Sequence, residues 1–228
     1  MKRLSLTAAV FTLAGVTLAG CSYPITYQYK MVFEVETPEG VKTAFNVVEV
    51  LIPSSGPTKA RGEALYLDLG SGRRPLIALL TSHHNNKGYM VGNWGDNSPF
   101  KILAKLYGEK FTDYGTKDEN LKKLVSYRGA REIKPNANDL PDLVTFADVN
   151  DPKSVIAVAA EDLAATLGEG VRWHKVTIEI TDEPVSTGIE QKLPWLKNRP
   201  IGGLDGRKLS KATDPWVTRL TDFDFKMD

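Results

Sequence analysis

The residues that could carry chemistry are few and scattered along the chain. His83 and His84 are adjacent, and His174 is the third and last histidine. On a strand, neighbouring side chains point to opposite faces, which is a poor arrangement for binding one metal ion. His174 shares its alternation with the apolar residues of a predicted strand, so we expect it at the wet edge of a core face. We therefore predict no metal site and no cofactor at these histidines.

The acidic residues give two weaker candidates. Asp182 and Glu183 follow a predicted strand, and paired carboxylates can act as general acid and base. At an exposed strand end, however, such residues usually face solvent. Asp148 and Asn150 match the first two ligand positions of an EF-hand loop, but a proline occupies the third. We expect Asn150 or Asp151 to cap or turn the chain instead.

The four tryptophans lie beside turn-forming or polar residues: Trp94, Trp173, Trp195 and Trp216. Aromatic side chains in loops can line a ligand groove or a partner surface. The interpretation we favour is that they fix loops onto the core. The chain contains no Gly-x-Ser-x-Gly elbow, phosphate loop or dinucleotide fingerprint. We therefore predict no catalytic residue.

The N-terminus carries the most specific motif. Two cations precede an uncharged, mostly apolar stretch over residues 4–20, and that order is typical of a secretory signal. The stretch ends in the motif Leu18-Ala19-Gly20-Cys21. This motif closely resembles the lipobox of bacterial lipoproteins, which reads leucine, small, small, cysteine. The resemblance implies that residues 1–20 are removed and that Cys21 is lipidated.

Two other interpretations of the leader stay open. One is an uncleaved transmembrane helix, although the apolar run is marginal in length for a span. The other is an ordinary signal peptide with an incidental cysteine. Cys21 is the only cysteine of the chain, and a lone thiol in a secreted protein is either a reactive liability or a modified residue. A serine follows it, which resembles the pattern sent to the outer membrane, so we favour the outer membrane over the inner one.

Charge limits the partners of the mature protein. Loss of Lys2 and Arg3 lowers the basic residues from 29 to 27, against 28 acidic residues, which is a net charge of −1. A near-neutral chain has no bulk attraction for nucleic acid. The membrane contact should therefore come from the lipid on Cys21, with more than one acyl chain needed for stable anchoring.

The elements that would position these residues are mostly strands. From position 26 the chain alternates strictly, and one face carries Tyr27, Tyr29, Met31, Phe33 and Val35. This predicts a half-buried strand, a turn at Pro38-Glu39-Gly40, and a second strand over 41–52 whose phase slips near Val47-Val48, as at a bulge. After a loop over 53–61, residues 63–69 and 75–80 predict two more strands. Four sequential strands predict an antiparallel meander in one sheet.

The remainder predicts an α+β fold with a few short helices. Helical spacing marks residues 99–107, 117–127 and 159–167, and residues 171–181 predict a last strong strand. A capping box at Thr187-Gly188-Ile189-Glu190 predicts a further helical turn. Prolines and glycines predict a long irregular segment over 194–215. We thus expect a signal peptide over 1–20, a lipidated tether over 21–25, and one globular domain over 26–228.

Several segments of the mature chain together resemble a set of uncharacterised proteobacterial proteins. They include Val35-Glu36-Thr37-Pro38-Glu39-Gly40, Asp151-Pro152-Lys153-Ser154-Val155, residues 162–168, residues 176–181, and Leu193-Pro194-Trp195-Leu196. The resemblance implies an envelope protein of unknown activity, and it assigns no catalytic residue.

Three functions follow as hypotheses. The first is a non-enzymatic binding or structural protein, lipid-anchored in the bacterial cell envelope and facing the periplasm. The second is a lipid-anchored hydrolase acting on envelope material, which needs His83 or His84 to meet Asp182 in a pocket. The third is a subunit of an envelope protein complex, which an exposed apolar patch would favour.

Overall fold

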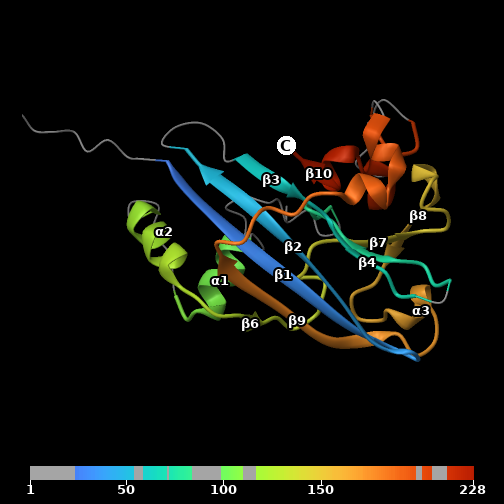
Figure 1. Cartoon of the computed structure of the whole chain (residues 1–228), viewed down its shortest axis with the longest axis horizontal. Coiled ribbons are helices and arrows are strands. Elements are labelled where there is room, and N and C mark those ends of the chain that lie inside the picture. Colours follow the sequence, from blue (N-terminus) through green and yellow to red (C-terminus); the bar gives the residue numbers. More distant parts are fainter. Residues whose placement is uncertain are drawn as a thin grey trace, which may run out of the picture.

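Two antiparallel sheets and several short helices make up the fold (Figure 1). The computed structural model describes residues 24–53, 59–70, 72–83, 99–109, 117–198, 202–206 and 215–228. Cys21, His84 and Trp94 lie outside the described residues.

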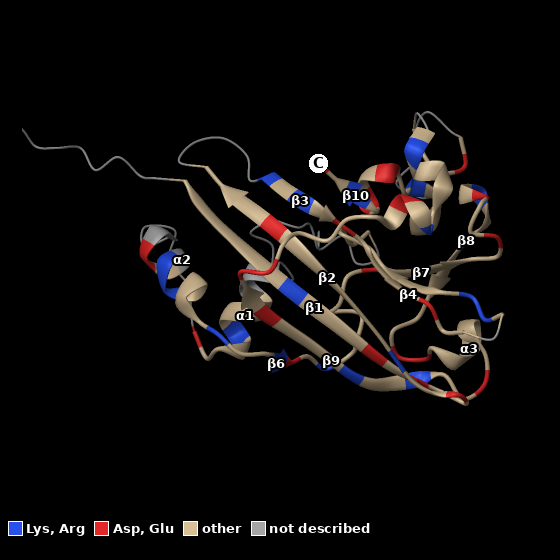
Figure 2. Cartoon of the chain, in the orientation of Figure 1, with Lys and Arg blue, Asp and Glu red and all other residues tan. Residues whose placement is uncertain are grey.

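The predicted N-terminal hairpin is confirmed. Strand β1 (Ile25–Thr37) pairs antiparallel with β2 (Gly40–Ile52), and Thr37 lies opposite Gly40. The alternating face of β1 is buried, with Phe33 fully enclosed. Much of the opposite face is charged (Figure 2). The register between β1 and β2 is unbroken, so the predicted bulge in β2 is wrong.

Strands β1 and β2 lie in the middle of a six-stranded sheet of order β10-β3-β2-β1-β9-β6. The other members are β3 (Lys59–Glu63), β6 (Arg131–Glu132), β9 (Arg172–Thr181) and β10 (Lys226–Met227). β9 confirms the predicted last strand, and its apolar positions point inward. β3 begins at Lys59, inside the predicted loop.

The prediction of a single meander is wrong, because the chain changes sheets at Ala64. A second sheet has the order β4-β5-β7-β8, with β4 (Leu65–Leu67), β5 (Leu76–Ala78), β7 (Leu143–Phe146) and β8 (Val155–Val158). One face of this sheet packs against the first sheet. Its other face packs against the C-terminal segment. The molecule is therefore built in three layers.

The helices are short. They are α1 (Pro99–Leu106), α2 (Lys117–Ser126) and α3 (Ala164–Leu167). α1 and α2 match their predictions, whereas α3 covers only the end of the predicted 159–167 helix. No helix within the described ranges is long and apolar enough to cross a membrane.

Short 3-10 helices form much of the described C-terminal part. They are η3 (Ile189–Gln191), η4 (Pro194–Asn198), η5 (Trp216–Arg219) and η6 (Asp222–Asp224), and an earlier one is η2 (Pro152–Ser154). Of these, only η4 lies inside the segment 194–215 that was predicted to be irregular, and η3 overlaps the helical turn predicted at 187–190. The chain then ends in β10.

Candidate functional site

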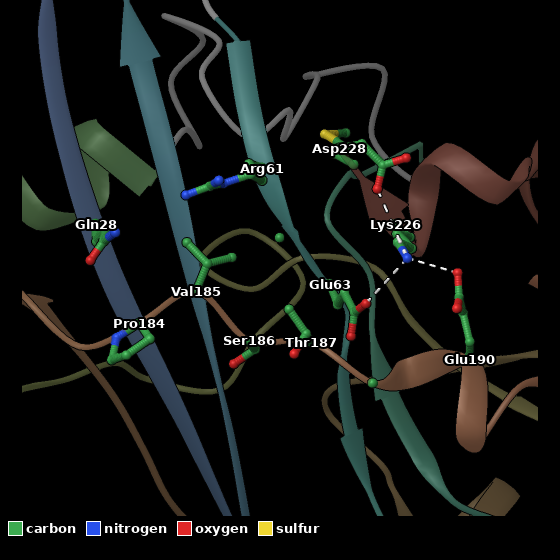
Figure 3. A pocket seen from close by; sticks show the side chains of 13 residues that line it. Gln28, Arg61, Glu63, Pro184, Val185, Ser186, Thr187, Glu190, Lys226 and Asp228 are labelled. Atoms are coloured by element: carbon green, nitrogen blue, oxygen red, sulfur yellow. Dashed lines mark hydrogen bonds and ion pairs between the residues drawn. The ribbon is translucent and has the colours of Figure 1, made fainter.

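A cleft of about 610 Å³ lies where β3, β10 and the segment 184–190 meet (Figure 3). Its volume falls within the range of about 300–1,000 Å³ that is usual for ligand sites. None of the residues predicted to carry chemistry lines it.

The cleft exists because β3 leaves the edge of β2. Arg61 is the last β3 residue paired with β2, opposite Glu49. Beyond this point the segment 184–188 lies beside β2. There the Val47 N–H donates to Ser186 Oγ at 2.8 Å, and the Ser186 N–H donates to the Val47 carbonyl at 3.1 Å. This segment also covers Val47, which explains the break in the alternation of β2 without a bulge.

Glu63 fixes the inner wall of the cleft. This residue is only 5% exposed, and its Oε2 accepts the Ile189 N–H at 2.7 Å. That bond caps η3, whose N-cap Gly188 has a left-handed backbone and no side-chain capping bond. The predicted capping box of Thr187 and Glu190 is therefore wrong, because a distant carboxylate has taken its place.

Lys226 lies among three carboxylates. Its Nζ is 2.7 Å from Glu190 Oε1, 3.7 Å from Glu63 Oε1 and 3.9 Å from Asp228 Oδ1. The hydrogen bond to Glu190 is the largest cause that raises the pKa of Lys226, and the three carboxylate charges add to it while burial opposes it. The ammonium group therefore stays charged at neutral pH. It cannot act as a nucleophile or a general base, since either role needs a free amine.

The two sides of the cleft differ in charge. Arg61 lies on one side with its side chain 59% exposed, and one guanidinium nitrogen is 3.2 Å from Glu49 Oε1. A guanidinium has five N–H donors, so others remain available. On the other side three carboxylates surround the single ammonium of Lys226. Val185 and Pro184 lie on the Arg61 side, away from Lys226 (Figure 3).

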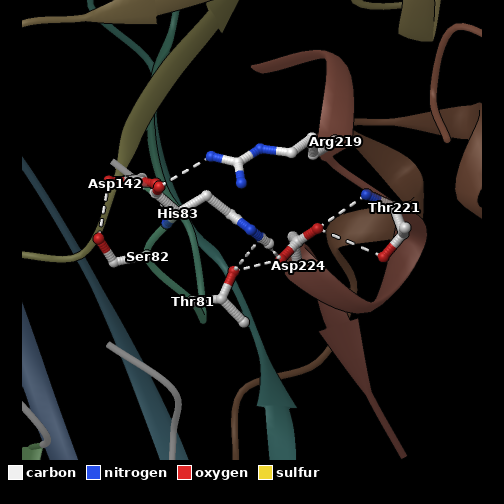
Figure 4. Close-up of polar contacts among 7 residues, drawn as sticks. All are labelled: Thr81, Ser82, His83, Asp142, Arg219, Thr221 and Asp224. Atoms are coloured by element: carbon white, nitrogen blue, oxygen red, sulfur yellow. Dashed lines mark hydrogen bonds and ion pairs between the residues drawn. The ribbon is translucent and has the colours of Figure 1, made fainter. Parts of the chain in front are cut away.

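A second polar cluster joins the end of the β5 segment to the C-terminal tail (Figure 4). His83 Nε2 is 2.8 Å from Asp224 Oδ1, and the Thr81 hydroxyl donates to the same oxygen. In a catalytic triad the hydroxyl and the carboxylate bind opposite nitrogens of the ring. Here both lie near Nε2, with Thr81 Oγ1 3.4 Å from that nitrogen. The cluster is therefore not arranged for nucleophilic catalysis.

Further contacts hold His83 in place. Its backbone N–H donates to Asp142 Oδ2, and its carbonyl accepts a bond of 3.1 Å from Arg219 Nη2. The hydrogen bond to Asp224 is the largest cause that raises the pKa of His83, and the charges of Asp224 and Asp142 add to it. Burial and the Arg219 charge oppose the rise.

The predicted partner of His83 lies elsewhere. Asp182 Oδ2 is 3.0 Å from Arg128 Nη2, and the Asp182 side chain is 84% exposed. Glu183 pairs with Lys30 at 2.6 Å. Both carboxylates are thus at an exposed strand end, as expected, and the His83–Asp182 pair that a hydrolase would need is not formed.

His174 is not at the edge of the core face. The register between β1 and β9 shifts at Glu34/Val35, and this irregularity brings His174 to the outer face. There it lies 3.1 Å from Glu36 Oε1 and 3.6 Å from Glu34 Oε2. The prediction from alternation failed because one extra residue reverses it.

Three of the tryptophans fix segments onto the core, as predicted. Trp195 contacts the Phe225 ring with centroids 5.2 Å apart, and Trp216 packs against the same cluster. Trp173 donates to the Ala160 carbonyl at 2.8 Å.

The capping prediction for Asp151 is also confirmed, since its side chain accepts the Lys153 N–H and caps η2. Among the residues that the structure describes, no three His, Cys, Asp or Glu side chains are grouped to hold a metal ion.

The comparisons with known proteins add no assignment to this geometry. The chain matches no protein-family model, no curated protein and no solved structure.

Proposed function

We propose that this chain is a lipid-anchored bacterial envelope protein whose folded domain binds a small zwitterionic ligand without transforming it. The lipobox ending at Cys21 supports the anchor. The charge division across the cleft supports the binding role.

The cleft is complementary to a ligand that carries a carboxylate at one end and an ammonium at the other. Arg61 offers N–H donors to the carboxylate. Glu190 and Asp228 offer acceptors to the ammonium, and their charges exceed the single charge of Lys226. Short peptides have this combination of end groups and fit a cleft of about 610 Å³.

The proposal of a binding role rests on what the polar groups already do. Glu63 caps a helix, Lys226 is held as a cation, and Asp224 binds several donors at once. Groups whose bonds are already made inside the fold supply no reactive base or nucleophile, and the ligand contacts are left to Arg61, Glu190 and Asp228. The hydrolase hypothesis gains no support from the described residues.

The complex-subunit hypothesis keeps one supporting observation. Val41 and Phe45 lie on the same outer face of β2 and are about half exposed. They are two separate side chains rather than a patch of several hundred Å², and Phe45 already contacts the Lys30 ammonium. We therefore place this role second.

The anchor is tested by the Cys21→Ser variant. Metabolic labelling with a fatty acid should label the wild-type protein and leave the variant unlabelled. Membrane fractionation should find the variant unprocessed or soluble. Equal label on both proteins would refute the lipid anchor.

The binding role is tested by calorimetric titration with alanine peptides of two to four residues. The free peptides should bind, and peptides blocked by N-acetylation and C-amidation should not. Arg61→Ala should weaken binding at least about tenfold, because a charged hydrogen bond contributes roughly 1.5–3 kcal/mol. Lys59→Ala, which removes a nearby cation that does not line the cleft, is the matched control. Equal binding of blocked peptides, or no binding of any peptide, would contradict the proposal.

A further inference from the structure

We infer that the domain has one fixed orientation on the membrane. The end of the domain where β1 begins faces the lipid headgroups, and the turn of the β1–β2 hairpin points away from them. The inference rests on the proposed lipid anchor at Cys21 and adds the orientation and the contacting surface.

The short tether fixes which end is near the bilayer. Only residues 22–24 separate Cys21 from Ile25, the first residue of β1. Four peptide steps span at most about 14 Å even when fully extended. The acyl chains on Cys21 must lie in the hydrocarbon layer, so the start of β1 is held within about that distance of the headgroups.

The length of the hairpin then sets how far the rest of the domain extends from the membrane surface. β1 and β2 are each 13 residues long and pair along their whole length. At about 3.3 Å per residue, the turn after Thr37 lies roughly 40 Å from the start of β1. A rigid, fully paired hairpin that stands upright has only one end at the membrane surface, and the short tether makes this the end where β1 begins.

The selected end presents side chains that suit phosphate headgroups. Helix α2 packs against β1 and lies near the end where that strand begins (Figures 1 and 2). Lys122 on α2 and Lys59 at the start of β3 are exposed, and neither forms an ion pair with another described residue. Exposed cations near an anionic membrane surface are attracted to it. The candidate cleft is also close to this end, because Gln28 in its lining is only three residues beyond Ile25.

The experiment compares two labels on the same outer face of the hairpin. In the lipidated protein the Cys21 thiol is blocked, so Thr26→Cys or Val41→Cys introduces the single reactive thiol. Both positions are exposed, and Val41 lies opposite Glu36, ten residues from Thr26 along β1. A fluorophore is attached to each variant. The proteins are reconstituted in phosphatidylcholine–phosphatidylglycerol vesicles that carry a headgroup-linked nitroxide quencher.

We expect quenching at position 26 to exceed quenching at position 41 by at least about threefold, because roughly 33 Å of strand separates them. Inserting 20 Gly/Ser residues after Ser22 should reduce this ratio towards one, since a flexible linker of that length reaches about 25 Å or more. Equal quenching at both positions without the linker, or stronger quenching at position 41, would overturn the orientation.

Intact-mass measurement separates this outcome from failure of the anchor. If the mature protein carries the lipid mass and the quenching ratio is reversed, the orientation alone is wrong. If the lipid mass is absent, the proposed anchor is wrong, and the orientation that rests on it is overturned as well.

Discussion

Asp224 is the residue on which the most polar contacts converge. It is buried, and its carboxylate accepts bonds from the Thr81 hydroxyl, the His83 ring and the Thr221 backbone N–H. The last of these belongs to the capping box that opens η6. One side chain therefore holds the C-terminal tail to the segment that follows β5.

Replacing Asp224 should be strongly destabilising. Asp224→Ala leaves the buried Thr81 hydroxyl and two partly buried donors, the His83 ring and the Thr221 N–H, without their partner. A buried polar group left unsatisfied typically costs about 1–3 kcal/mol. Glu169→Ala removes a carboxylate that is exposed and should change the free energy of unfolding by within about 0.5 kcal/mol. Chemical denaturation measures both. A loss below about 1 kcal/mol for Asp224→Ala would mean that the cluster does not hold the tail.

The raised pKa of His83 predicts a pH-dependent stability. Because the folded-state pKa lies above the unfolded value, the protonated ring favours the fold. Its contribution is fully present below about pH 6.5, the unfolded value, and is lost as the pH rises through the folded-state pKa. The difference in unfolding free energy between wild type and His83→Gln should therefore be larger near pH 6 than near pH 9. A constant difference over that range would show that the ring does not titrate with folding.

At the scale of elements, the sequence predicts well the strands that have one solvent-exposed face. β1, β2 and β9 alternate because one side packs on the core and the other meets water, and this is the pattern that hydrophobic periodicity detects. β5 is buried on both faces, and its short apolar run does not reveal the sheet to which it belongs. The change of sheets at Ala64 gives no signal in the sequence either, since Leu65 and Leu67 continue the same alternation.

The candidate cleft could not be predicted, because its walls are far apart in the sequence. Glu63 and Lys226 come from opposite ends of the mature chain, and a lone acidic or basic residue in a strand usually predicts an exposed surface. The capping box of Thr221 and Asp224 did have a local signal, a threonine followed three residues later by an acidic residue. It lies beyond the prolines and glycines of 194–215, which predict irregular structure and indicate no helix start.

The segment 184–190 should depend on Glu63 for its order. Glu63→Ala frees the Ile189 N–H inside the fold, which costs about 1–3 kcal/mol. Hydrogen exchange at the amides of Ile189–Gln191 should accelerate more than exchange in β1. Glu190→Ala is the matched control, because it removes a carboxylate partner of Lys226 but leaves the Ile189 bond intact. Equal acceleration in the two variants would contradict a specific role of Glu63.

At the scale of the whole molecule, the second sheet joins two hydrophobic clusters into one body. One cluster fills the space between the two sheets and includes Phe33. The other lies beneath the C-terminal segment and includes Phe146, Trp195 and Phe225. The tail belongs to both layers, because β10 pairs with β3 of the first sheet while Phe225, which follows η6, belongs to the second cluster.

This arrangement predicts that damage to either cluster destabilises the whole domain. Phe225 is fully buried, and its ring centroid lies 5.9 Å from that of Phe146 and 5.2 Å from that of Trp195. Phe225→Ala should cost about 3–5 kcal/mol, as should Phe33→Ala in the other cluster, through lost burial and a residual cavity.

The decisive measurement is hydrogen exchange of the two sheets in each variant. If the clusters form one cooperative unit, the most protected amides of β1 and β7 should lose protection together, whichever phenylalanine is replaced. Phe45→Ala is the control, because this aromatic side chain is 51% exposed and should cost far less. If Phe225→Ala accelerated exchange in β7 and left β1 unchanged, the C-terminal layer would be an independent unit. The backbone hydrogen bond from the Ala64 N–H to the Phe225 carbonyl joins the C-terminal segment to the sheets. In that outcome this bond would not make the two layers unfold together, and the single-domain interpretation would be wrong.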